Sequence, residues 1–325
     1  MYRRMLVPLD GSELAEVVFP YAKELAARLD LDVVLLHVLK PEERGTAPLH
    51  RAYVEHKAEI VESQSEEVRQ KAGIEPRRRS LNVRGEVVAG YPAEEILRYA
   101  DDNEIDLILM ATHGRSGIRR WLMGSVADKV LQASKIPVWL VWAGVPEEIV
   151  YDKWPRRTIL VPLDGSELAE TVLPHVEALA KQRGEELVDV VLLQVCEPPA
   201  MPDYYPPSAR FKTPRGTVHI TPAEYMKAAI ARSRALAEKY LARVEKRLEG
   251  AGLINVRSEL LMGEPAQQIA NYTNSNPFNL VVMSTHARSG MSQWAYGSVA
   301  LKVLQGVTSP IFLIRPHQSD SDKPQ

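Results

Sequence analysis

Short apolar runs alternate with amphipathic segments along the first half of the chain. The apolar runs are typical of strands buried on both faces, and they stand at residues 5–8, 32–38, 83–89, 106–111 and 137–141. Between them apolar residues recur at helical spacing, which predicts helices at residues 14–29, 51–72, 93–103 and 125–133. Strands and helices in this order predict a doubly wound parallel sheet, because parallel neighbours require right-handed crossover connections.

The second half of the chain repeats the first. VPLDGSELAE stands at residues 7–16 and again, letter for letter, at 161–170. Three further segments match in the same order: VRGEVVAG with VRSELLMG, THGRSG with THARSG, and GSVADKVLQ with GSVALKVLQ. A repeat of roughly 150 residues is a duplicated domain, since solenoid repeats have about 20 to 50 residues. We therefore expect two doubly wound five-stranded parallel sheets with helices on both faces.

The repeat also sets the expected domain boundaries. We expect a first domain over residues 1–144, a linker over 145–157 and a second domain over 158–316. The second copy is longer, mainly through the Pro-rich stretch 197–220, whose composition cannot hold a helix or a central strand. This stretch is predicted to form a long irregular loop. Residues 317–325 are polar, and we expect them to form a disordered tail.

Composition and charge narrow the class of protein. A net charge of −2 with 45% hydrophobic and 25% charged residues is typical of a soluble globular protein, and it argues against nucleic acid as the main partner. The single Cys196 excludes an intramolecular disulfide and a thiolate metal cluster. No run of 18 apolar residues occurs, and the first strand begins too early for a signal peptide. We expect a cytoplasmic protein with no membrane contact.

The repeated motifs follow the first and fourth strands of each copy. In open α/β sheets, ligands bind beyond the carboxyl ends of the strands, where the strand order reverses. Asp10 follows the first strand, and Gly124 with Ser125 opens a helix whose free N–H groups and dipole favour an anion such as phosphate. The alternative is that Ser125 is only an N-cap, with Asp128 completing a capping box. The two interpretations are compatible.

On these motifs the whole chain resembles a tandem universal stress protein, with two family domains in one chain. The family's nucleotide motif is Gly-x2-Gly-x9-Gly-Ser/Thr, in which backbone and hydroxyl groups hold the phosphates of ATP. The first copy matches it at Ala111, Gly114, Gly124 and Ser125, with alanine in place of the first glycine. The resemblance implies an adenine nucleotide alpha hydrolase-like fold and an ATP site in this copy.

The resemblance also implies what the other residues do. Asp10 corresponds to the family acid near the adenine and ribose, and Val38 to the residue whose backbone reads the base. The full set of candidate binding residues in the first copy is Pro8, Leu9, Asp10, Val38, Ala111, His113, Gly114, Arg115, Gly124, Ser125 and Val126. The set in the second copy is Pro162, Leu163, Asp164, Val195, Ser284, Gly297, Ser298 and Val299.

The second copy departs further from the family motif. Ser284 and Ala287 replace both early glycines, and only Gly297 and Ser298 remain. Alanine where a glycine must adopt a positive φ costs on the order of 1 kcal/mol or more and crowds a phosphate. We expect ATP in the first copy, and weaker binding, AMP or no ligand in the second. Tyr204 and Tyr205 of the insertion are predicted to help cover the second site.

Two histidines stand inside these motifs. His113 and His286 could polarise a phosphoryl transfer, but a structural histidine bonded to backbone is the favoured interpretation, because no acid at a telling spacing supports a general base. Packing likewise explains Trp121 and Trp294 better than base stacking.

Three function classes remain open. P-loop, dinucleotide and ATP pyrophosphatase loops are all absent from the sequence. A nucleotide-binding regulatory protein of the stress response is preferred, a slow ATP hydrolase or phosphotransferase is the alternative, and a structural protein without nucleotide is the third. A role for magnesium stays open. The resemblance also implies that the last strands of the two copies, at 137–141 and 310–314, pair within the chain as a pseudo-dimer, while a homodimer of two chains stays open.

Overall fold

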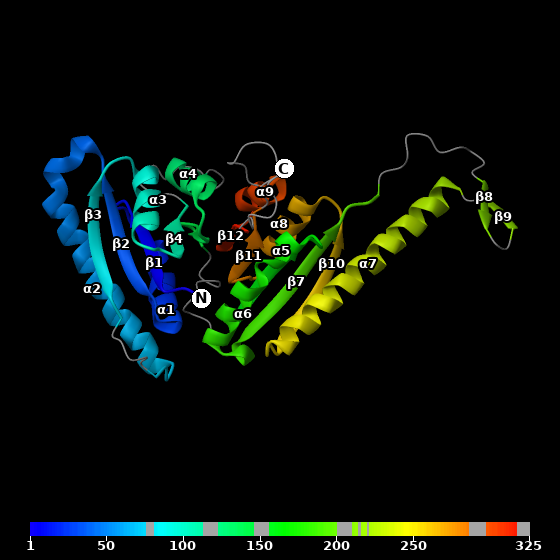
Figure 1. Cartoon of the computed structure of the whole chain (residues 1–325), viewed down its shortest axis with the longest axis horizontal. Coiled ribbons are helices and arrows are strands. Elements are labelled where there is room, and N and C mark those ends of the chain that lie inside the picture. Colours follow the sequence, from blue (N-terminus) through cyan, green and yellow to red (C-terminus); the bar gives the residue numbers. More distant parts are fainter. Residues whose placement is uncertain are drawn as a thin grey trace, which may run out of the picture.

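A sheet of ten strands runs through both copies of the repeat (Figure 1). The computed structural model describes residues 1–75, 81–112, 123–145, 156–199, 210–213, 216–219, 221–285 and 297–316. The first copy supplies β1 (Arg4–Leu9), β2 (Asp32–Leu39), β3 (Val83–Ala89), β4 (Leu107–Ala111) and β5 (Val138–Val141). The second supplies β6 (Arg157–Leu163), β7 (Val188–Cys196), β10 (Asn255–Met262), β11 (Leu280–Ser284) and β12 (Ile311–Ile314). The order is β10-β7-β6-β11-β12-β5-β4-β1-β2-β3.

Helices cover both faces of this sheet. The first copy contributes η1 (Glu16–Val18), α1 (Phe19–Leu29), η2 (Pro41–Thr46), α2 (Ala47–Lys71), α3 (Pro92–Asp102) and α4 (Ser125–Ala133). The second contributes α5 (Glu167–Glu170), α6 (Leu173–Arg183), η4 (Glu185–Leu187), α7 (Pro222–Gly250), α8 (Pro265–Ser275) and α9 (Ser298–Gly306). The doubly wound α/β fold predicted from the sequence is therefore confirmed. None of the described helices combines the length and apolar character that a membrane span requires.

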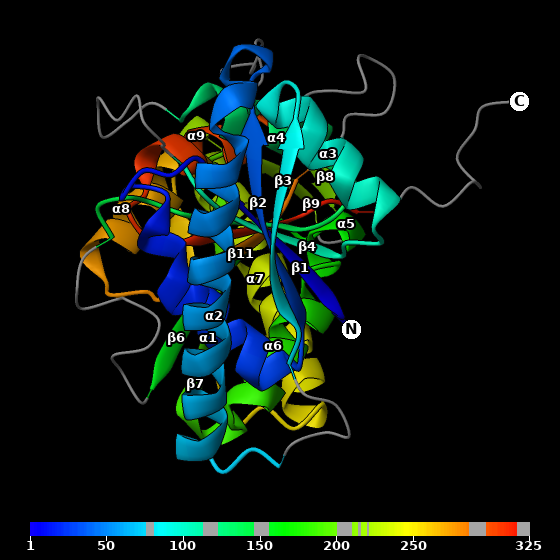
Figure 2. The ribbon, with the colours of Figure 1, turned by 90° about the vertical axis from the view of Figure 1, so that its left-hand side faces the viewer.

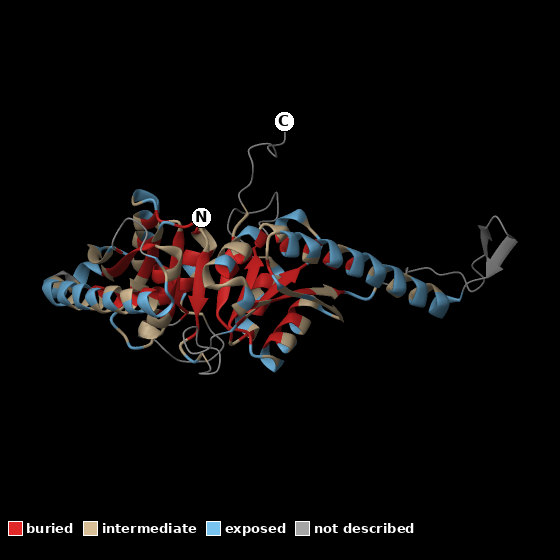
Figure 3. Cartoon of the chain, turned by 90° about the horizontal axis from the view of Figure 1, so that it is seen from below, coloured by how far each residue is buried: buried red, intermediate tan, exposed pale blue. Residues whose placement is uncertain are grey.

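Alternating strand residues feed two separate cores, one on each face of the sheet. Val7 and Leu35 belong to the core that α1, α2, α6 and α7 cover, whereas Leu6 and Val34 belong to the core that α3, α4, α8 and α9 cover. Figure 2 shows α2 lying along the sheet at the end formed by the first copy. Both cores include residues of both copies, and the buried residues form a continuous band through the middle of the molecule (Figure 3).

The two halves of the sheet meet at β5 and β12. These strands are antiparallel, whereas the other neighbouring strands of the large sheet are parallel. Trp139 lies opposite Phe312, both side chains are fully buried, and their ring centroids are 5.1 Å apart. The sheet thus changes direction once, at a junction filled by aromatic side chains.

The insertion of the second copy is not wholly irregular. It contains β8 (Arg210–Thr213) and β9 (Gly216–His219), an antiparallel hairpin that lies beyond the amino end of α7 (Figure 1). The prediction of a continuous irregular loop over 197–220 is wrong for these residues. Prolines exclude a helix and a central strand but not a separate hairpin, and the Phe, Thr and Val content of this segment favours one. Residues 200–209, with Tyr204 and Tyr205, and the tail 317–325 lie outside the described residues.

Gly85 allows α2 to lie directly on β3. A Cβ at this position would be 2.6 Å from the carbonyl carbon of Val54 and 2.7 Å from the amide nitrogen of Glu55. We predict that Gly85→Ala lowers the free energy of unfolding by about 1–3 kcal/mol, because backbone atoms cannot yield as a side chain would. The equivalent Ser258 already carries a Cβ and donates to Glu245 at 2.8 Å. Ser258→Ala is the matched control, with a loss of no more than about 1 kcal/mol. Urea unfolding measures both, and equal losses would contradict the steric argument.

His175 on α6 gives the junction a dependence on pH. Its Nδ1 is hydrogen-bonded to the hydroxyl of Tyr2, and burial lowers the pKa of His175 from 6.5 to about 4. The unfolded chain therefore takes up this proton at a higher pH than the folded chain does. The neutral imidazole therefore makes its full contribution to the free energy of unfolding above pH 6.5, and this contribution is lost as the pH falls towards 4. We predict that His175→Gln flattens the fall of melting temperature between these values. His56→Gln, at an exposed site, should leave the slope unchanged, and a slope unaltered by His175→Gln would refute the assignment.

Candidate functional site

A cavity of about 310 Å³ lies at the carboxyl ends of β1, β2 and β4. The chain places β2 and β3 on one side of β1 and β4 and β5 on the other, so the strand order reverses beside β1. The first turn of α4 closes the cavity. A cavity of this size at a switch point is the ordinary location and scale of a small-ligand site.

The cavity brings together the described candidate residues of the first copy. Its lining includes Pro8, Leu9, Asp10, Val38, Ala111, Gly124, Ser125 and Val126. The motif residues His113, Gly114 and Arg115 lie outside the described residues, as do Trp121, His286, Ala287 and Trp294.

The loop after β1 holds the Asp10 carboxylate in a fixed orientation. Gly11 adopts φ 80°, and Oδ1 of Asp10 accepts hydrogen bonds from the amide and hydroxyl of Ser12, at 3.0 and 2.6 Å. The second copy repeats this turn, with Ser166 donating to Asp164 at 2.9 and 2.6 Å. The short Asp-to-Ser turn therefore presents a carboxylate at the rim of each cavity, as a hydrogen-bond acceptor of set direction.

Each of these loops is also attached to the long helix of its copy. Glu16 accepts from the hydroxyl of Tyr53 at 2.9 Å and from Nζ of Lys57 at 2.7 Å. Burial, and then the hydrogen bond to Glu16 and the charges of Glu16 and Asp10, raise the pKa of Tyr53, so the phenol stays protonated and donates.

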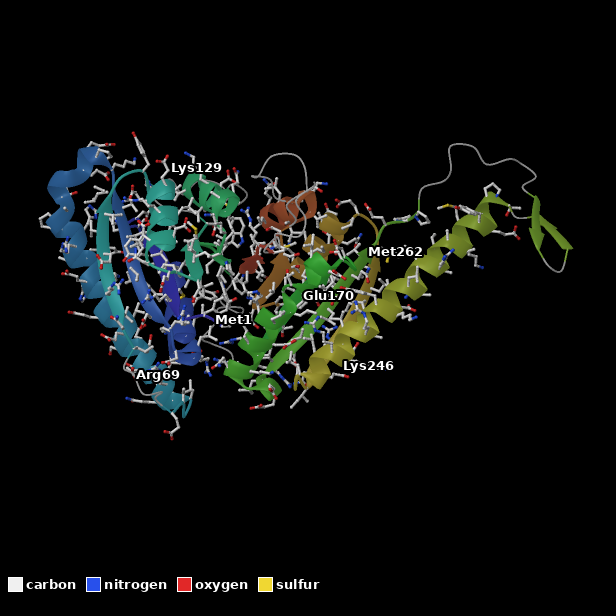
Figure 4. All side chains as sticks on the ribbon, viewed as in Figure 1. Met1, Arg69, Lys129, Glu170, Lys246 and Met262 are labelled. Atoms are coloured by element: carbon white, nitrogen blue, oxygen red, sulfur yellow. The ribbon has the colours of Figure 1, made fainter. Side chains whose placement is uncertain are left out.

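The second copy builds the same attachment from other residues. Glu170, labelled in Figure 4, accepts from Arg243 at 2.6 Å and from Arg247 at 3.2 Å. The phenol of Tyr240 lies close enough to Glu170 for that carboxylate, after burial, to raise its pKa. In both copies a glutamate six residues after the rim aspartate thus fixes the loop to α2 or α7.

The start of α4 differs from the capping box considered above. Gly124 is the N-cap residue, its amide donates to the carbonyl of Thr112 at 2.8 Å, and no side chain within the described part of the chain caps the helix. Oδ2 of Asp128 accepts from Gln132 instead, at 2.9 Å. The prediction that Ser125 is the N-cap is wrong, because the bond from Gly124 to Thr112 turns the chain one residue earlier.

This start leaves a donor-rich surface in the cavity. Ser125, Val126 and Ala127 are the first three helical residues, and all three line the cavity. Amides in a first helical turn have no partner within the helix, and the helix dipole adds positive potential at this end. The geometry can therefore hold an anion opposite Asp10.

The second copy has a cavity of about 320 Å³ in the equivalent position. Its lining includes all of the candidate residues of this copy: Pro162, Leu163, Asp164, Val195, Ser284, Gly297, Ser298 and Val299. Gly297 is the N-cap of α9, again without a described side-chain cap. Both halves of the predicted arrangement, the rim aspartate and the helix start, are present in each copy.

The polar side chains around the two cavities differ. His37, Lys40 and Glu43 line only the first cavity, and sequence analysis missed all three. His37 is buried and its ring stacks on that of His50, with centroids 4.1 Å apart and planes 13° from parallel. In the register that pairs Val38 with Val195, a glutamate, Glu197, replaces Lys40. A histidine inside an apolar strand and a lysine just past its end were the signals available in the sequence.

Comparison with known proteins identifies the family. A model of the universal stress protein family matches residues 1–141 and 155–315. The chain belongs to the universal stress protein family. Universal stress protein Rv2005c of Mycobacterium tuberculosis is 21% identical over 317 residues, which cover 96% of each chain. Universal stress protein MJ0577 of Methanocaldococcus jannaschii is 31% identical over 156 residues, which cover 43% of this chain and 95% of that one.

Two solved structures share the fold over nearly the whole chain. The crystal structure of a universal stress protein from Archaeoglobus fulgidus has a TM-score of 0.59 at 20% identity, and covers 96% of this chain and 98% of that one. A functionally unknown protein of Pseudomonas aeruginosa, PA1789, has a TM-score of 0.66 at 14% identity over 97% of this chain and 93% of its own. At these identities the likeness shows a shared fold.

Proposed function

We propose that this universal stress protein binds adenine nucleotides and that ATP occupies the first cavity. One observation carries the proposal: the first turn of α4 and the carboxylate of Asp10 line the same cavity. Amides of the helix start suit phosphate oxygens, and a carboxylate suits the hydroxyls of a ribose or the amino group of a base.

Apolar side chains of the first cavity suit the faces of a purine. Leu36, Ile96 and Met110 line it together with Val38. A mostly apolar lining with a few directed polar groups is the usual composition of a small-ligand site. By resemblance to the family, the backbone of Val38 reads the edge of the base.

We infer a weaker or smaller ligand, AMP or none, for the second cavity. Glu197 in the position of Lys40 replaces a cation by an anion near the end of β7, which disfavours a multiply charged ligand. Ser284 replaces Ala111 beside the helix start, and alanine stands at the second glycine of the motif. The amides of α9 remain as an anion site.

The proposed role is regulatory rather than catalytic. Among the described residues, no group of three or more His, Cys, Asp and Glu is arranged to hold a metal ion. Magnesium would therefore arrive with the phosphates of ATP, not on a cage of protein ligands. The cavity touches β1, β2, β4, α3 and α4. A bound nucleotide would change the surfaces of these elements, and with them the binding of partner proteins in the cytoplasm during stress.

A carboxylate at the helix start tests the phosphate position. Aspartate is a good N-cap, so Gly124→Asp should fold, but its carboxylate competes for the amides of α4 and repels phosphate. We predict that the Kd for ATP rises at least tenfold, by about 1.4 kcal/mol or more, in calorimetric titration.

Two control variants sharpen this test. Gly124→Ala separates bulk from charge and should cost less affinity than aspartate. Gly297→Asp makes the same change in the second copy and should leave the ATP affinity of the first unchanged. Retained affinity in Gly124→Asp would mean that the phosphates lie elsewhere. Freshly purified, denatured protein should also release adenine nucleotide detectable by mass spectrometry, and no release together with no ATP-induced rise in melting temperature would refute binding altogether.

Turnover separates the regulatory role from the enzymatic alternative. We predict that ATP hydrolysis in the presence of magnesium stays at background for the natural sequence and for Ser125→Ala. Turnover well above background that Ser125→Ala abolishes would instead establish a slow ATP hydrolase or phosphotransferase.

A further inference from the structure

A buried ion pair crosses the junction between the two copies. Glu24 on α1 accepts from Nη1 of Arg183 on α6 at 2.8 Å, and from Nε of Arg28 on its own helix at 2.7 Å. The side chains of Glu24 and Arg183 are only 7% and 8% exposed. At this depth a charge deprived of its partner is strongly unfavourable, so the pair constrains which helices can meet.

The repeat shows that each partner of this pair exists in only one copy. α1 and α6 are equivalent helices in the register of VPLDGSELAE. In this register Glu24 corresponds to Ala178, and Arg183 corresponds to Leu29. Two first copies from separate chains, packed in the same geometry, would bring Glu24 against leucine, with Arg28 of its own helix as its remaining partner. Two second copies would bring Arg183 against alanine.

A second contact across the junction follows the same rule. The hydroxyl of Tyr2 is hydrogen-bonded to Nδ1 of His175. The equivalents of these residues are Arg156 and Tyr21 respectively. A pair of first copies would bring two tyrosines together, and a pair of second copies would bring an arginine against a histidine. Both alternatives replace the observed contact between a phenol and an imidazole, one by two phenols and the other by a guanidinium and an imidazole.

We propose that these contacts form a pairing code between unlike copies. The surface formed by α1 and Tyr2 fits the surface of α6 from a second copy and disfavours the same surface of another first copy. Its partner is therefore the other half of the same chain or, when chains exchange halves, the unlike half of a second chain. The code is separate from the two candidate nucleotide cavities, because neither Glu24 nor Arg183 lines either of them.

Complementary charge reversal tests the code on the full chain. Glu24→Arg and Arg183→Glu each set like charges against each other inside one chain. When the two variants are unfolded, mixed and refolded, each first copy finds an opposite charge only on the second copy of the other variant. We predict a one-to-one heterodimer with exchanged halves, at least tenfold more abundant in native mass spectrometry than mixed dimers of light and isotope-labelled natural chains.

A matched pair controls for charge reversal as such. Arg234 and Glu238 form an ion pair on α7 with side chains 59% and 57% exposed. A mixture of chains with Arg234→Glu and chains with Glu238→Arg, treated in the same way, should form no more heterodimer than the natural chains do.

A neutral variant guards against misfolding of the charged ones. Glu24→Ala with Arg183→Leu gives each position the residue of the other copy and removes both charges of the pair, while Arg28, whose side chain is 15% exposed, stays on α1. We predict that this variant folds cooperatively. We also predict that mixtures of its labelled and unlabelled chains form dimers in which like copies pair, at least tenfold more abundant than the mixed dimers of natural chains. The proposal is overturned if the charge-reversed mixture yields no heterodimer above the natural level, or if the neutral variant remains as selective as the natural chain.

Discussion

The antiparallel pairing of β5 with β12 is the constraint on which the rest of the molecule depends. A parallel sheet ends in strands whose free edges invite pairing, and here the apolar edge of each copy is covered by that of the other. The facing pair Trp139 and Phe312 fills the junction, and helices on both faces then pack across it. Two sheets of modest size thereby share one pair of cores, which bury more surface per residue than two separate domains would.

The parallel half-sheets fix the cavities in turn. The carboxyl ends of β1, β2 and β4 must meet at one edge, so the backbone alone creates a hollow that the first turn of α4 closes. The second copy inherits the same hollow through β6, β7 and β11. Backbone geometry therefore explains why the cavities are alike, whereas side chains such as His37 and Lys40, which line the first cavity, make it differ from the second.

The sequence predicts the features of the structure that follow a repeated pattern. It does not predict features that depend on one contact between residues far apart in the chain. Apolar periodicity and the duplicated segments predicted the strands and the helices, and the resemblance to the family implied the candidate residues that line both cavities. The N-cap of α4 was missed because it depends on the bond from Gly124 to Thr112, a contact across the loop that no local pattern reveals. The hairpin of β8 and β9 was missed because prolines nearby suggested irregular structure throughout. His37 was missed because it lines the cavity through its place near the end of β2, which the apolar pattern of that strand does not indicate.

In the loop and helix that follow the first strand of each copy, the two copies differ where they contact each other and agree where they form the cavities. The loop and helix after β1 carry the rim carboxylate at one end and the junction contacts at the other. VPLDGSELAE is identical in both copies at the cavity end, whereas Leu29 and Arg183, two turns or more farther along, are different. Binding needs the same backbone turn in each copy, but pairing of unlike halves needs complementary side chains. A duplicated chain can satisfy both demands only if the helix diverges while the loop does not, and that is the distribution of differences in α1 and α6.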